Sequence, residues 1–211
     1  MVRVKICGIT NIEDALAAIE AGANALGFVF AESPRKIDSD TALSIIKSLP
    51  VHIAAVGVFA DQEPSDILQI MEKADLHFAQ IHGGVDESFA GALEGVQWGL
   101  IRALRIGSIE DIEQAAEDSL IAVCDAILLD SRVEGIVGGT GQTFNWELVI
   151  QARALGKPVI LAGGLTPENV EEAVRQTRPY AVDVSTGVEA SPGKKDHAKI
   201  KEFIQNARKT E

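Results

Sequence analysis

The feature that most constrains the fold is an alternation of short apolar runs with amphipathic segments along the whole chain. Eight runs are rich in aliphatic residues, as buried parallel strands are, and they cover residues 2–7, 25–30, 53–59, 76–81, 96–104, 126–130, 158–161 and 180–184. Between the runs lie segments that we interpret as helices; in several of them apolar side chains recur with helical spacing, whereas residues 109–117 are mostly polar and Gly91 interrupts the segment near 87–93. The sequence therefore predicts eight strand–helix units of roughly 26 residues each.

Two of the predicted helices carry recognisable start signals. Thr10 and Glu13 match the capping box that opens a helix. Thr166, Pro167 and Glu168 stand in the order of a capping residue followed by a first-turn proline. We therefore expect helices to begin at these two places.

Eight units with no segment left over predict a single (β/α)8 TIM barrel, an α/β fold in which residues 1–211 form one catalytic domain. A doubly wound sheet is the alternative. It usually has fewer units and a G-x-G-x-x-G turn after its first strand. Here that turn reads Cys7-Gly8-Ile9-Thr10 and lacks the pattern. No linker or low-complexity tract divides the chain.

Net charge and hydropathy limit the classes of molecule that the chain is expected to bind. The chain has 31 acidic and 19 basic residues, a net charge of −12, which disfavours binding to nucleic acid or to an anionic membrane. A small anionic molecule stays possible, because a cleft can be locally positive. No apolar stretch approaches the roughly 18 residues of a membrane span. The first ten residues, interrupted by Arg3 and Lys5, do not resemble a signal peptide. We expect a cytoplasmic protein.

Strand ends are the places to look for catalytic residues, since barrel active sites lie there. Cys7 closes the first predicted strand, and Asp130 ends the apolar sixth strand, where we expect its carboxyl group to be partly desolvated. A thiol and a carboxyl group at one barrel mouth suit general acid–base chemistry. Cys124 precedes its strand, so we interpret it as a small buried residue of the opposite end.

The loops after the seventh and eighth strands predict a phosphate site, because barrels commonly bind phosphate there. These loops contain Gly163, Gly164, Ser185, Thr186 and Gly187. Glycines let backbone N–H groups approach an anion closely. The alternative is that these glycines only form tight turns.

Two further side chains follow predicted strands. Arg35 comes after Ser33-Pro34, where it is either a clamp for a carboxylate or a solvated surface charge. His82 follows the fourth strand, but no second histidine stands at metal-ligand spacing. We therefore expect His82 to contact substrate and expect no metal site. Two cysteines are too few for a disulfide framework or a zinc ligand set.

Several segments, in order along nearly the whole chain, resemble those of the phosphoribosylanthranilate isomerase family of tryptophan biosynthesis. They are VKICGIT at 4–10, ALGFVFAESPRKI at 25–37, VGVFAD at 56–61, QIHG at 80–83, ILLDS at 127–131, GGTGQTFNW at 138–146, AGGLTPENV at 162–170 and VDVSTGVEASPGKKD at 182–196. Together they are specific, although none is so alone.

The resemblance implies a (β/α)8 barrel that carries out an Amadori rearrangement without cofactor or metal. Its substrate, a phosphorylated small molecule, is an aminoaldose that becomes an aminoketose. The resemblance makes Cys7 the general base and Asp130 the general acid, and it places Arg35 at the anthranilate end. The loops around Gly141, Gly164 and Gly187 resemble the phosphate cradle. A monomer or a homodimer is expected.

One position departs from the family pattern. The family segment usually reads Phe-Asp-Trp, and here it reads Phe144-Asn145-Trp146. Aspartate and asparagine are nearly equal as helix caps, so a purely capping role is unaffected. A role for the charge in tuning the loop would alter substrate affinity.

Two competing functions remain. Another small phosphate-binding barrel enzyme, such as an indole-glycerol-phosphate synthase or a ribulose-phosphate epimerase, would need a catalytic lysine with glutamates or a metal cluster at strand ends. A non-catalytic phosphometabolite-binding barrel would be expected to lose Cys7 or Asp130 first, and both are present.

Overall fold

The computed structural model describes residues 1–130 and 146–209. Eight parallel strands form a closed barrel in sequence order, with β1 hydrogen-bonded to both β2 and β8. The strands are β1 (Arg3–Cys7), β2 (Ala25–Val29), β3 (Ala54–Phe59), β4 (Phe78–Ile81), β5 (Gly99–Arg105), β6 (Ala126–Asp130), β7 (Val159–Ala162) and β8 (Ala181–Val184). The predicted (β/α)8 barrel is confirmed.

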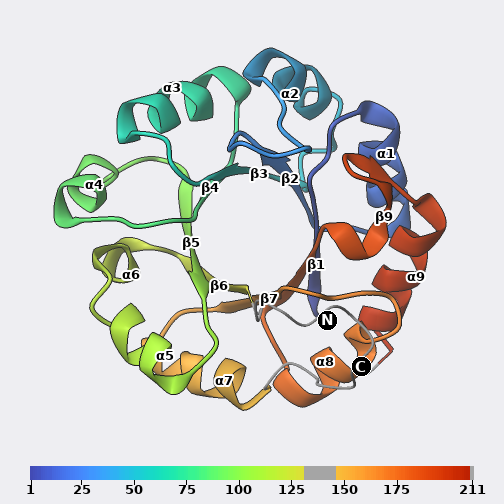
Figure 1. The fold of residues 1–211 in the computed structure, drawn as a ribbon. Helices are drawn as coiled ribbons and strands as arrows, with labels where there is room; N and C mark the ends of the chain where they lie inside the picture. The colour runs from blue at the N-terminus through green and yellow to red at the C-terminus, as the bar shows by residue number, and fades with distance from the viewer. Residues whose placement is uncertain (131–145, 210–211) are drawn as a thin grey trace.

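Helices surround the strand ring on the outside (Figure 1). The α-helices are α1 (Ile12–Ala21), α2 (Ser39–Ile46), α3 (Pro64–Ala74), α4 (Glu87–Ala92), α5 (Ile109–Ala115), α6 (Ser119–Val123), α7 (Trp146–Gln151), α8 (Val170–Thr177) and α9 (His197–Ala207). Short 3-10 turns cover Ala152–Leu155 and Thr186–Val188. Within the described residues, we find no helix with the length and apolar character needed to cross a bilayer.

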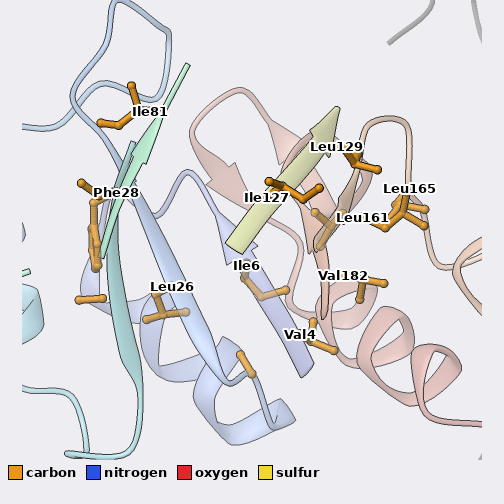
Figure 2. Close-up of a cluster of buried hydrophobic side chains, with 14 of the residues drawn as sticks. Val4, Ile6, Leu26, Phe28, Ile81, Ile127, Leu129, Leu161, Leu165 and Val182 are labelled. Atoms are coloured by element: carbon orange, nitrogen blue, oxygen red, sulfur yellow. The ribbon is translucent and has the colours of Figure 1, made fainter. Parts of the chain in front are cut away.

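Side chains alternate between two cores along each strand, because successive residues of a strand point to opposite faces. Val4 and Ile6 point outward and join the large core between barrel and helices, which Figure 2 shows together with Leu26, Phe28, Ile127 and Leu161. The intervening residues point into the barrel. There a second apolar cluster contains Val56, Ile101, Leu128 and Ile160. A polar inward-facing residue is therefore an exception that needs a partner.

A small antiparallel hairpin follows the barrel. Its strands are β9 (Glu189–Ser191) and β10 (Lys194–Lys195). The Thr10 hydroxyl donates a hydrogen bond of 2.6 Å to the carbonyl oxygen of Gly193 in the hairpin turn. The hairpin is thereby attached to the loop after β1, at the mouth formed by the carboxyl ends of the strands.

That contact explains why the predicted start of the first helix was wrong. The capping residue of α1 is Asn11, whose side-chain oxygen accepts a hydrogen bond of 2.8 Å from the backbone N–H of Asp14. Thr10 uses its hydroxyl for the hairpin instead. A tertiary contact has displaced the local cap by one residue.

Two other helix predictions also need correction. The segment after Thr166 forms a turn first, in which the Asn169 side chain accepts a hydrogen bond of 2.8 Å from the Thr166 N–H. Helix α8 begins only at Val170. In addition, the sequence predicted one helix between β5 and β6, whereas the structure has both α5 and α6 there. Asp118 caps α6 through the backbone N–H of Leu120.

Candidate active site

The parallel barrel brings all strand carboxyl ends to one mouth, and a pocket of about 320 Å³ opens there. Most of the residues predicted from strand ends line this pocket. They are Cys7, Arg35, His82, Asp130, Gly163, Gly164, Ser185 and Thr186. The structure therefore brings together side chains that lie far apart in sequence.

Cys7 ends β1 and is buried, with 7% of its surface exposed. Its strand neighbour is Gly27, and a Cβ atom at Gly27 would lie only 2.7 Å from the Cys7 sulfur. Gly27 is therefore the residue that leaves space for the thiol. Burial raises the pKa of the Cys7 thiol, and the nearby ammonium groups of Lys5 and Lys195 oppose that rise.

Asp130 ends β6, and its carboxyl group is half-buried at the mouth. Going round the barrel, β7 and β8 separate β6 from β1. Asp130 and Cys7 thus stand on different parts of one rim and face the same pocket. This arrangement allows an acid and a base to act on different atoms of one bound molecule.

Two charged side chains inside the barrel, Lys5 and Asp183, were not predicted as site residues from the sequence. Lys5 is buried, with 3% of its surface exposed, and its ammonium donates hydrogen bonds of 2.9 Å to Gln80 Oε1 and to Asp183 Oδ1. Lys5 and Asp183 are register partners across β1 and β8. Each lies at an inward-facing position of an otherwise apolar strand. Lys5 is two residues before Cys7, the residue that ends β1 at the mouth.

His82 follows β4 and lies 2.7 Å from Gln80, between the ring Nε2 and the amide nitrogen. Burial, the Lys5 charge and other cations lower the pKa of His82 to about 4. The ring is therefore neutral near pH 7. Because the Gln80 oxygen accepts from Lys5, its amide nitrogen donates to His82 Nε2, which leaves the ring proton on Nδ1.

Arg35 lines the pocket and is held by a glutamate that was not predicted. Its Nε and Nη2 donate to Oε1 and Oε2 of Glu189, both at 2.6 Å. The buried Lys195 ammonium donates a further hydrogen bond of 3.0 Å to Glu189 Oε1. Although burial raises it, the pKa of Glu189 is lowered overall by Arg35 and Lys195. Glu189 is therefore an ionised carboxylate between two cations.

The predicted phosphate residues divide into two groups. Gly163 and Gly164 have φ angles of +82° and +64°, a backbone shape that favours glycine, and both line the pocket with Ser185 and Thr186. Gly187 is not among the pocket-lining residues. A Cβ atom there would lie 1.9 Å from the backbone oxygen of Leu165, so Gly187 lets the loops after β7 and β8 approach each other.

Some predicted features lie elsewhere. Cys124 is buried at the other end of the barrel, where its sulfur lies 3.6 Å from the Ile121 oxygen. Gly141 and Asn145 lie outside the described residues. In residues 1–130 and 146–209, no three His, Cys, Asp or Glu side chains gather closely enough to hold a metal ion.

Comparison with known sequences decides the family. The profile described as N-(5'phosphoribosyl)anthranilate (PRA) isomerase matches residues 4–206. An N-(5'-phosphoribosyl)anthranilate isomerase from Pseudomonas fluorescens (strain Pf0-1) is 51% identical over 214 residues, covering 98% of each chain. The chain belongs to this family. The family's activity is an isomerisation in tryptophan biosynthesis.

Solved structures of phosphoribosylanthranilate isomerases have the same fold. One, in complex with reduced 1-(o-carboxyphenylamino)-1-deoxyribulose 5-phosphate, has a TM-score of 0.86 and 42% identity, covering 99% of each chain. Another, of monomers of the dimeric enzyme from Thermotoga maritima, has a TM-score of 0.85 and 41% identity, also covering 99% of each chain. The molecule bound in the first of these structures is a phosphate ester with a carboxyphenylamino group.

Proposed function

We propose that the chain isomerises N-(5′-phosphoribosyl)anthranilate to 1-(2-carboxyphenylamino)-1-deoxyribulose 5-phosphate, with Asp130 as general acid and Cys7 as general base. Residues 1–211 would act as one catalytic domain. The observation that carries this assignment is that Cys7 and Asp130 line one pocket from different parts of its rim. Further support comes from the family match over residues 4–206.

The proton movements balance without a cofactor. Asp130 gives its proton to the furanose ring oxygen, the bond from that oxygen to C1′ breaks, and the nitrogen lone pair forms a cationic Schiff base. Cys7 then takes the proton from C2′, and the C–H electron pair neutralises the iminium group as an enolamine. Tautomerisation yields the ketone. No electron is gained or lost by the molecule as a whole, so aldose becomes ketose by proton transfer alone.

The environment of Cys7 supports this order of steps. Since burial raises the pKa of the thiol, the resting enzyme holds it largely protonated near pH 7. A cationic Schiff base formed first would favour the thiolate, because a neighbouring positive charge lowers a thiol pKa. Ring opening by Asp130 therefore prepares the base for the second step.

The two ends of the substrate have matching surroundings. We assign the phosphate to the rim formed by Gly163, Gly164, Ser185 and Thr186, where glycine lets backbone N–H groups approach an anion closely. We assign the anthranilate carboxylate to Arg35. Glu189 occupies the Nε and Nη2 edge of this guanidinium, so the Nη1 edge is the one that would receive the carboxylate.

The remaining assignments are coarser. The neutral His82 ring lines the same pocket and is proposed to contact the substrate through a hydrogen bond. A dimer is described for the Thermotoga maritima relative, and we propose a monomer or a homodimer for this chain. We also propose a cytoplasmic location and no nucleic-acid partner, in keeping with the net charge of −12.

The two cysteines provide a matched test. Substrate turnover is followed by loss of the anthranilate fluorescence, which simple binding does not abolish. We expect Cys7→Ala to lower kcat by about 10²–10⁴-fold, with an unchanged circular dichroism spectrum. Cys124→Ala, also a buried cysteine replaced by alanine, should retain kcat near wild type. Equal losses in both variants would refute the role assigned to Cys7.

A further inference from the structure

Lys5 is a buried cation whose two partners, Gln80 and Asp183, line the active-site pocket. Its ammonium has two hydrogen-bond acceptors, Gln80 Oε1 and Asp183 Oδ1, each at 2.9 Å. Only 4% of its side chain is exposed to solvent. A buried ammonium is costly unless it is paired, so its presence at this depth indicates a use for the charge.

Lys5 and Cys7 lie on the same face of β1, and both side chains lie next to Gly27 of β2. A Cβ atom at Gly27 would lie 3.1 Å from Lys5 Cε and 2.7 Å from Cys7 Sγ. The missing side chain of Gly27 therefore leaves one small space that the lysine stem and the thiol share. The charge of Lys5 acts on Cys7 across this space, with no intervening side chain of β2.

We propose that Lys5 favours the thiolate of Cys7 in addition to the cationic Schiff base, by holding a fixed positive charge beside the sulfur, and that Asp183 keeps Lys5 charged while opposing the thiolate. Lys5 is thus a positioning residue that acts through Cys7. Its consequence for turnover rests on the function proposed above, but its electrostatic coupling to the thiol does not.

The charged groups around Cys7 agree with this assignment. Lys5 from β1 and Lys195 from β10 favour the thiolate, and Asp183 from β8 opposes it. Arg35, on the loop after β2, is coupled to Cys7 as well. The pocket rim also carries Glu32, Arg105, Asp130 and His82, of which His82 is neutral near pH 7.

The charged groups that act on Cys7 are mostly cations. Of the charged groups coupled to Cys7, Lys5, Lys195 and Arg35 are cations and Asp183 is a carboxylate. The neighbourhood of Cys7 is therefore locally positive in a protein whose net charge is −12. The Asp183 and Cys7 charges also raise the pKa of Lys5 above its ordinary value despite the opposing effect of burial, so the ammonium persists across the working range of pH.

The test measures the titration of Cys7 directly, by its ultraviolet thiolate absorbance and by the pH dependence of its alkylation by iodoacetamide. A Cys124→Ala background leaves Cys7 as the remaining cysteine. Lys5→Met should move the midpoint upward by about one pH unit or more, since one unit is a modest change for a lost neighbouring charge. Asp183→Asn should move it downward, with Gln80 still holding the ammonium.

The opposite directions expected for the Cys7 titration midpoint in Lys5→Met and Asp183→Asn distinguish the proposal from general damage to the barrel. Arg102→Met is the matched control. Arg102, on β5 and away from Cys7, is also a buried cation, and its Nε lies 2.7 Å from a carboxylate oxygen of Asp118. It should leave the Cys7 midpoint within about 0.3 pH unit of wild type. A shift of the same sign in Lys5→Met and Asp183→Asn, or none in either, would overturn the proposal.

Turnover provides the second measurement. Lys5→Met should lower kcat at least about tenfold, with KM changed less than threefold, and should shift the acid limb of the kcat profile in step with the thiol titration. A fall in kcat with an unmoved titration would mean that Lys5 is only structural. If Lys5→Met does not fold, the downward shift in Asp183→Asn decides, and its absence rejects the coupling. If Cys7→Ala retains full activity while the titrations shift as expected, the assignment of the base fails and the coupling stands.

Discussion

Arg35 and Glu189, 154 positions apart in the sequence, form a two-bonded ion pair, with Nε on Oε1 and Nη2 on Oε2 at 2.6 Å each. The pair fixes the plane of the guanidinium, because rotation of that plane would break at least one of the two hydrogen bonds. Lys195 holds Glu189 in turn, and its side chain is fully buried. The β9–β10 hairpin thus supports a residue of the loop after β2, and we infer that it aims the Nη1 edge of Arg35 into the pocket.

Glu189→Gln should raise KM more than it lowers kcat. The amide loses the charge that holds Arg35 in one plane, and a carboxylate bound by Arg35 does not itself react, so ground state and transition state lose about the same energy. A charge-assisted hydrogen bond contributes about 1.5–3 kcal/mol, which corresponds to a rise in KM of roughly tenfold to a hundredfold. Steady-state kinetics measure both constants.

Glu172→Gln is the matched control for that variant. Glu172 makes the same two-bonded contact with Arg175, at 2.9 and 2.6 Å, but on the exposed surface of α8. Exposed ion pairs contribute little, so KM, kcat and stability should stay near wild type. A KM unchanged in Glu189→Gln would mean that the hairpin does not position Arg35 for substrate.

His82 should make the fold sensitive to mild acid. Its pKa is about 4 in the folded protein, against about 6.5 in an unfolded chain. Between these values the unfolded chain binds a proton that the folded protein excludes, so the stability of the fold is complete above pH 6.5 and decreases as the pH falls toward 4. Over that window the loss is about 3 kcal/mol.

Urea unfolding at several pH values measures this effect. His82→Gln should flatten the dependence between pH 6.5 and 4, because glutamine does not titrate. His52→Gln, at an exposed site near the opposite end of the barrel, should leave the wild-type slope in place. Equal slopes for wild type and His82→Gln would contradict the burial of a neutral ring.

Gly187→Ala should separate the loops after β7 and β8. The added Cβ would lie 1.9 Å from the Leu165 backbone oxygen, which forces a backbone shift next to the proposed phosphate rim. We expect at least about a tenfold weaker affinity for inorganic phosphate and for substrate, since misplacement of about 1 Å is costly. Isothermal titration calorimetry with phosphate measures the first effect.

Gly91→Ala tests whether replacing any glycine by alanine weakens phosphate binding. No atom lies within 4 Å of a Cβ atom built at Gly91 in helix α4. Alanine should therefore stabilise the helix by roughly 0.5–1 kcal/mol and leave phosphate binding unchanged. Weakened phosphate binding in both variants would remove the special role of Gly187.

The sequence was enough to predict the barrel and most of the pocket rim. Parallel strands of a barrel end at one mouth, so Cys7, His82 and Asp130 could be placed together from their positions after apolar runs. Lys5 and Asp183 carried a signal that strand-end reasoning overlooked. Each interrupts an apolar strand at an inward-facing position, as alternation along the strand shows.

Glu189 and Lys195 could not have been found in the same way. They belong to a hairpin that folds back over the mouth, and in sequence they resemble ordinary surface charges. The start of α1 failed for a related reason, because Thr10 binds Gly193 from the same hairpin. Local propensity predicts a cap only where no tertiary partner competes for the side chain.

The central claim, that proton transfer by Asp130 opens the ring, is tested most directly by the kcat of Asp130→Asn. Asparagine keeps the shape of the side chain and has no acidic proton to give. Asp61→Asn, an exposed carboxyl group after β3, serves as the control and should stay within about twofold of wild type. With freshly generated substrate and folding checked by circular dichroism, we predict that Asp130→Asn lowers kcat by about 10²–10⁴-fold with KM changed far less. A folded Asp130→Asn variant with kcat within about tenfold of wild type would contradict the claim, since a lost general acid costs more than that.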